Sequence, residues 1–132
     1  MKTVKILLAI SLCFVSCSKK TEKKDEQKFD SITGHWSVFA YYTSGNYFTQ
    51  TDDGDYYDFD GNGNCSYYSG DLLDTYDEYE YTFNKETQTI TCIHDRGWNL
   101  SISVEYLDKN EAIFHITGKT SSSSKTVKVR RD

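Results

Sequence analysis

The segment WNLSISVEY, residues 98–106, carries the clearest structural signal in this chain. Apolar or aromatic residues occupy every second position, and polar residues occupy the positions between them. Successive side chains of a β-strand point to opposite faces, so a period of two separates an apolar face from a polar one. The sequence therefore predicts a strand at 98–107 that is buried on one side and exposed to water on the other.

The same alternation marks seven further segments. In the segment 77–83, for example, Tyr79, Tyr81 and Phe83 share one face. Aromatic residues make up 15% of the chain, which favours strands over helices. The predicted fold class is all-β, an eight-stranded antiparallel up-and-down meander closed into a small barrel, because closure removes exposed strand edges. A two-sheet sandwich is the alternative. The predicted strands span 34–42, 55–60, 64–70, 77–83, 88–93, 98–107, 111–117 and 124–131.

The connections give the predicted barrel two different ends. Short turns at 61–63, 84–87 and 108–110 lie at one end, and the longer loops gather at the other. Small barrels hold ligands at such a mouth. The loops at this end span 43–54, 71–76, 94–97 and 118–123, and we expect their aspartates to form a solvated acidic rim composed of Asp52, Asp53, Asp55, Asp71, Asp74 and Asp77.

Gly34, His35 and Trp36 open the first predicted strand. Their position resembles the Gly-x-Trp signature of lipocalins, and the segment 32–132 resembles the short lipocalin-like domains of bacterial lipoproteins. The resemblance implies that Trp36 plugs the closed end of the barrel and that an arginine near the end of the last strand packs across it. This arginine is Arg130 or Arg131, and we assign it to Arg130. The middle lipocalin motif and the helix after the last strand are missing, so the family's ligand chemistry is not carried over.

The amino terminus has the pattern of a signal peptide. Lys2 and Lys5 flank the start of an apolar run at 6–15, which is too short to span a bilayer. The residues before Cys17 resemble the lipobox of bacterial lipoproteins, and a plain secretory signal is the alternative. We expect a signal peptide at 1–16, a lipidated Cys17 that anchors the protein to the membrane, a flexible charged tether at 17–31 and the barrel domain at 32–132. Ser18 resembles an outer-membrane sorting signal, which implies an outer-membrane location in the cell envelope, at the periplasmic face or the cell surface.

Charge and motif content exclude several classes of function. From Phe29 onward there are 17 acidic and 8 basic residues, which argues against nucleic acid as a partner. No nucleophile motif or metal-ligand spacing is present, so we predict no catalytic residue, no metal and no cofactor. Asp58, Asp60 and Asn62 have the spacing of a calcium-binding loop, but a hairpin turn with positive φ at Gly61 and Gly63 explains the segment better.

Cys65 and Cys92 are the two thiols of the predicted domain. They fall on strands that are separated by a third strand, about 9.6 Å apart at ~4.8 Å per neighbour, which is too far for a disulfide. We therefore expect two small buried apolar residues.

Two functions fit the predicted barrel. The first is a binding protein that holds a small apolar or aromatic ligand in the barrel or at its mouth. The second is a barrel filled by its own rings that acts on another envelope protein, for instance as an inhibitor; an enzyme is less well supported than either. The predicted ligand-binding residues are Tyr79, Tyr81, Trp98 and Phe114.

Overall fold

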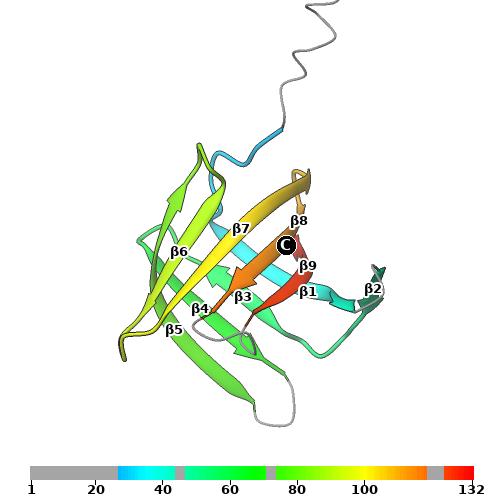
Figure 1. Ribbon diagram of the computed structural model, residues 1–132, viewed down its shortest axis with the longest axis horizontal. Coiled ribbons are helices and arrows are strands. Elements are labelled where there is room, and N and C mark those ends of the chain that lie inside the picture. Colours follow the sequence, from blue (N-terminus) through cyan, green and yellow to red (C-terminus); the bar gives the residue numbers. More distant parts are fainter. Residues whose placement is uncertain (1–26, 44–46, 71–73, 119–123) are drawn as a thin grey trace, which may run out of the picture.

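The computed structural model describes residues 27–43, 47–70, 74–118 and 124–132, which form one antiparallel sheet of nine strands (Figure 1). The first strand, β1, pairs with both β3 and the last strand, β9, so the sheet closes into a barrel. This closure confirms the predicted eight-stranded barrel and excludes the sandwich; β2 is an additional strand. The strands are β1 (Gly34–Thr43), β2 (Tyr47–Gln50), β3 (Tyr56–Phe59), β4 (Asn64–Ser69), β5 (Thr75–Asn84), β6 (Thr89–His94), β7 (Asn99–Asp108), β8 (Glu111–Thr117) and β9 (Lys125–Arg131).

The extra strand β2 lies where the sequence predicted a loop at 43–54. The lower half of β1, which is nearer the closed end with its short turns, pairs with β3 through residues 34–37. The upper half, which is nearer the open end, pairs with β2 through residues 40–43. A register shift between Val38 and Ala40 interrupts the β1–β9 ladder between these two halves. The short β2 therefore covers an edge of β1 that β3 does not reach. An uncovered edge would leave a row of backbone groups without partners.

Aromatic rings fill the lower half of the barrel, which is the half nearer the closed end. Trp36, Tyr57, Phe59 and Phe114 are all less than 2% exposed. The ring of Phe114 lies 5.5 Å from that of Trp36 and 5.7 Å from that of Tyr57, measured between centroids. Such edge and tilted contacts are the favourable geometries for aromatic pairs. We call these four residues the floor of the barrel.

The closed end is built around Trp36. Its indole nitrogen donates a hydrogen bond of 2.8 Å to the carbonyl of Ile32, and the Arg131 guanidinium lies 4.8 Å above its ring. The assignment of this role to Arg130 is wrong. Val127 and Val129 face inward, and alternation places Arg131 on the same face, directly opposite Trp36.

Arg130 faces outward instead. Its guanidinium forms an ion pair of 2.9 Å with Glu111 and lies 4.6 Å above the ring of Phe39. Gly34 leaves room for the Arg131 side chain, because a Cβ there would lie 2.8 Å from it. Its φ of +139° is also a conformation that residues with a side chain rarely adopt.

Residues 29–33, which precede β1 and which we call the strap, also belong to the packed domain. Phe29, which lies in the predicted tether, is buried, and its ring centroid lies 5.4 Å from that of Trp36. The side chain of Gln88 accepts a hydrogen bond from the Phe29 amide and donates one to the Phe29 carbonyl, both at 2.9 Å. The packed domain thus begins at Phe29 rather than at residue 32.

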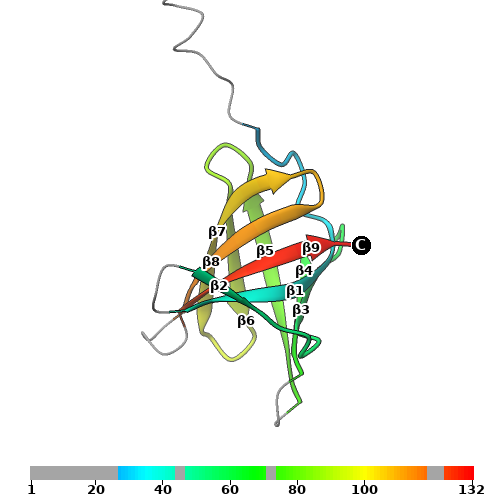
Figure 2. The same cartoon turned by 90° about the vertical axis from the view of Figure 1, so that its right-hand side faces the viewer.

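Both ends of the described chain lie at the closed end of the barrel (Figure 2). The backbone amide of Asp132 donates to the carbonyl of His35, next to the strap. The predicted signal peptide and Cys17 lie outside the described residues. Within the part of the chain that the structure describes, no helix could cross a membrane.

Candidate functional site

The open end of the barrel carries a cluster of aromatic and ionisable side chains. Tyr79, on β5, and His94, at the end of β6, are register partners, and their rings meet edge to face with centroids 5.2 Å apart. Trp98 stacks on the other side of His94, with centroids 3.8 Å apart and planes at 16°. Asp77 completes the group, with its carboxylate 3.4 Å from Nε2 of His94. We call these four residues the mouth cluster.

The turn between β6 and β7 holds the His94 ring in place. The His94 amide donates to the carbonyl of Trp98, and Gly97, with a φ of +91°, lets the chain reverse. Nδ1 of His94 lies 3.0 Å from the Arg96 amide and 2.7 Å from an Asp95 carboxylate oxygen. Nδ1 can accept a hydrogen bond from the Arg96 amide. Contacts on both ring nitrogens and the stacked Trp98 ring therefore define the position of the His94 side chain.

A second group of polar contacts lies across the mouth. The Lys125 ammonium donates a hydrogen bond of 2.6 Å to the Tyr67 hydroxyl and lies 4.6 Å from the centre of the Tyr67 ring. Tyr67 is the register partner of Asp77, so this contact adjoins the mouth cluster. The open end therefore combines flat rings with charges of both signs.

Asp55 does not belong to the acidic rim on which the sequence analysis placed it. Its carboxylate is 4% exposed and accepts hydrogen bonds from the Tyr41 hydroxyl and, at 2.7 Å, from the Gly70 amide. A buried carboxylate needs such donors to replace water. Burial, together with the hydrogen bond to Asp55, raises the pKa of Tyr41 well above its ordinary value. Asp52, Asp53 and Asp74 are exposed, Asp77 is half-buried in the mouth cluster, and Asp71 lies outside the described residues.

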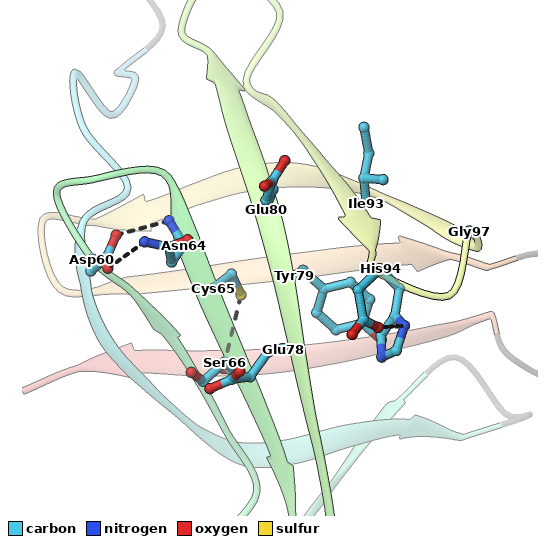
Figure 3. A pocket seen from close by; sticks show the side chains of 11 residues that line it. Asp60, Asn64, Cys65, Ser66, Glu78, Tyr79, Glu80, Ile93, His94 and Gly97 are labelled. Carbon is cyan, nitrogen blue, oxygen red and sulfur yellow. Dashed lines mark hydrogen bonds and ion pairs between the residues drawn. The ribbon is translucent and has the colours of Figure 1, made fainter.

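A groove of about 770 Å³ runs along β4, β5 and β6 and reaches Tyr79 and His94 (Figure 3). Glu78, Glu80 and Asp95 also line it, so its walls are acidic. Figure 3 shows the side chains of Tyr79 and His94 next to each other. Burial raises the pKa of the Tyr79 hydroxyl, so this group is a neutral hydrogen-bonding partner over the ordinary pH range.

The predicted ligand-binding residues do not form one site. Tyr79 and Trp98 meet through His94, as described above. Phe114 is fully buried in the floor, where a ligand could not reach it without displacing other rings. Tyr81 lies nearer the closed end, where its hydroxyl donates a hydrogen bond of 2.5 Å to the carbonyl of Asp60.

The sequence pattern predicts no binding role for His94 and does not single out Tyr67 or Lys125. One signal was available for His94. Ile90 and Cys92 alternate inward on β6, and position 94 continues the same face. The contact between Tyr67 and Lys125 joins residues 58 positions apart, so only the closed barrel brings them together.

The residues of the possible calcium-binding loop have structural roles instead. The Asp60 carboxylate accepts hydrogen bonds of 2.8 Å from the amides of Asn62 and Asn64, and these bonds lower its pKa. Gly63 has the predicted positive φ, of +88°, whereas Gly61 does not, so the predicted role of Gly61 is wrong. Within the described residues, no three His, Cys, Asp or Glu side chains are grouped as a metal site.

Cys65 and Cys92 are free, buried thiols that face each other in the barrel interior. A hydrogen bond from the Cys92 thiol and burial both raise the pKa of Cys65, so its reactive thiolate is disfavoured. The two cysteines therefore serve as small packing residues.

In comparisons with protein-family models, curated proteins and solved structures, no match to this chain was found.

Proposed function

We propose that this protein binds a small apolar or aromatic ligand at the open end of its barrel, in the manner of a lipocalin-like binding protein. The observation that carries this proposal is the mouth cluster. Its stacked rings lie at the open end, whereas the floor residues already fill the interior nearer the closed end. A planar ligand gains most by stacking on rings that are themselves held in place. Trp98 and Tyr79 supply such rings, and the Tyr79 hydroxyl and Asp77 supply polar groups that would orient the ligand.

The floor limits how deep this ligand can go. Trp36, Tyr57, Phe59 and Phe114 occupy the lower half of the barrel. An eight-stranded barrel has an interior that is just wide enough for side chains or for one small ligand. Because side chains fill the lower half, we place the ligand at the mouth rather than in the centre.

Binding of an environment-sensitive apolar dye tests this proposal. Trp98→Ala is expected to weaken dye binding about tenfold, because stacking aromatic residues are the usual hot spots of binding sites. Tyr79→Ala is expected to weaken binding and also to lower the melting temperature, because Tyr79 is only 7% exposed. Dye fluorescence titration measures the first effect, and thermal denaturation the second.

Leu107→Ala is the matched control for Trp98→Ala. Leu107 is an exposed apolar residue of β7 that lies near the closed end, so its loss should leave dye binding unchanged. A wild-type protein that takes up no dye would contradict the proposal. Equal binding by the wild type and Trp98→Ala would do so as well.

The protein is further proposed to be a lipoprotein anchored through Cys17 in the outer membrane. The apolar run at 6–15 followed by Ser16 and Cys17 supports this. More than one acyl chain on Cys17 would give stable anchoring, whereas a single chain would not.

Labelling of cells with a palmitate analogue tests the anchor. The wild-type protein is expected to be labelled, and Cys17→Ala is expected to lose the label completely and to keep its signal peptide. Cys13→Ala is the control and should be labelled like the wild type. Label that persists in Cys17→Ala, or that depends on Cys13, would contradict the assignment.

A further inference from the structure

Three tyrosines form a row across the outer face of the barrel. Tyr56 on β3 lies directly opposite Tyr68 on β4, which lies directly opposite Tyr76 on β5. The rings of Tyr56 and Tyr68 stack at 5.3 Å with an angle of 21° between their planes. Tyr76 is 53% exposed, so its ring is open to solvent. We call these residues the tyrosine row.

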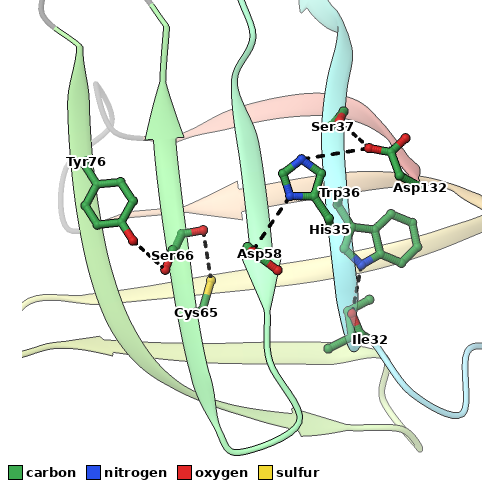
Figure 4. A network of polar contacts seen from close by, with 9 residues as sticks. All are labelled: Ile32, His35, Trp36, Ser37, Asp58, Cys65, Ser66, Tyr76 and Asp132. Carbon is green, nitrogen blue, oxygen red and sulfur yellow. Dashed lines mark hydrogen bonds and ion pairs between the residues drawn. The ribbon is translucent and has the colours of Figure 1, made fainter.

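A row of polar residues, two of them acidic, runs beside the tyrosine row. Asp58, Ser66 and Glu78 are register partners on the same three strands. The Tyr76 hydroxyl lies 3.1 Å from the Ser66 hydroxyl (Figure 4). It also lies 3.4 Å from the Glu78 carboxylate, so the two rows are in contact. Within the described residues, no Lys or Arg side chain forms an ion pair with Asp58 or Glu78; His35 lies 3.9 Å from Asp58. The negative charge of this face is thus poorly compensated.

The distribution of charge along the chain strengthens this imbalance. Residues 29–84, which include β1 to β5, contain 11 Asp and Glu but no Lys or Arg. Residues 85–132 contain 6 acidic and 8 basic residues. The barrel therefore has one wall of a single charge sign. Such a wall raises the local concentration of cations and attracts positively charged partners.

We propose that the outer face of β3, β4 and β5 binds a lysine- and arginine-rich segment of a protein partner. The open ring of Tyr76 offers a site for a cation–π contact with a guanidinium or ammonium group. The Glu78 carboxylate, beside the same ring, can pair with that cation. Asp58 lies two strands away and can pair with the next basic side chain of an extended segment. This surface is on the outer side of the wall, whereas the mouth cluster lies at the open end; Glu78 and Ser66 also line the groove that reaches Tyr79 and His94.

The geometry favours a basic polypeptide over a carbohydrate. Sugars are bound by rings that present an open face, but both neighbours of Tyr56 cover its faces. Tyr68 stacks on Tyr56 at 5.3 Å, and the His35 ring lies 4.6 Å from Tyr56 on a tilted plane. The row therefore offers one open ring and several carboxylates rather than a flat aromatic platform.

Fluorescence anisotropy of a labelled nona-arginine peptide tests the proposal with the full chain at physiological salt, where the Debye length is about 8 Å and distant charges are screened. Tyr76→Ala is expected to weaken binding about tenfold without a change of charge, and Glu78→Lys by at least as much. Tyr47→Ala and Glu105→Lys are the matched controls, because they make the same changes at exposed positions on β2 and β7. Both controls are expected to bind within about twofold of the wild type.

Several outcomes would overturn the proposal. One is the absence of peptide binding by the wild type. Binding of soluble dextran, a neutral carbohydrate, in place of the peptide would point to a carbohydrate instead. Another is an equal loss in Glu78→Lys and Glu105→Lys, which would show attraction to net charge alone. A third is unchanged binding by Tyr76→Ala. Because Tyr76 and Glu78 are exposed, the variants should remain folded, and a thermal melt checks this before binding is measured.

Discussion

Trp36→Ala is expected to lower the free energy of unfolding by about 3 to 5 kcal/mol, the range for large aromatic residues truncated in a core. Trp36 is fully buried and contacts the rings of Phe29 and Phe114. Its loss would also leave the Ile32 carbonyl without its donor and the Arg131 guanidinium without the ring beneath it. Urea denaturation, read from the midpoint and the slope, measures the change.

The neighbouring residue provides the control for this experiment. His35 points outward, and its side chain is 40% exposed. Its ring contacts Tyr56 and lies 3.9 Å from the carboxylates of Asp58 and Asp132, all on the outer face. His35→Ala should therefore cost about 0.5 kcal/mol or less. Small and similar losses in Trp36→Ala and His35→Ala would show that the closed end does not depend on Trp36.

Asp55→Ala is expected to cost about 2 to 4 kcal/mol, because two buried donors would lose a charged acceptor. The first donor is the Tyr41 hydroxyl, and the second is the Gly70 amide. Water cannot easily replace Asp55, since a Cβ added to Gly70 would collide with the Asp53 backbone, which shows how closely the segments pack there. Urea denaturation again measures the loss.

Asp52→Ala controls for the removal of a negative charge from the same segment. Asp52 is exposed and forms no ion pair within the described residues, so its removal should change stability by about 0.5 kcal/mol or less. Asp55→Asn is expected to fall between the two, because an amide oxygen still accepts one hydrogen bond. A stability of Asp55→Ala equal to that of Asp52→Ala would contradict the structural role of Asp55.

Alternation in the sequence predicts which residues face the barrel interior, because that pattern is local. The inward positions Ile102 and Val104 on β7 and Ala112 and Phe114 on β8 are buried as expected. The same rule, applied from Val127 and Val129, would have selected Arg131 instead of Arg130. That error came from the resemblance, which specified an arginine near the strand end but not its face.

Other features depend on contacts between distant residues. The segment YFTQ of β2 has no clear alternation, and it becomes a strand because the upper half of β1 offers it an edge. Asp55 reads as one more loop aspartate until the fold brings Tyr41 and Gly70 to it. Phe29 follows a charged segment, and its burial depends on distant residues: Gln88, 59 residues away, binds its backbone, and Tyr106 packs against its ring.

The candidate site was predictable to a similar extent. Tyr79 and Trp98 could be assigned to the open end from strand direction and alternation. The roles of His94 and Lys125 could not, because they depend on a stacking geometry set by the 94–98 turn and on a contact across the mouth.

The strap formed by Phe29 gives the molecule a direction. Gln88 clamps Phe29 to the closed end, and the mouth cluster lies at the opposite end of the strands. A support to which the amino-terminal part of the chain is fixed would therefore be connected to the barrel at its closed end. The mouth lies at the end of the barrel farthest from that connection, and the tyrosine row lies along the side of the barrel.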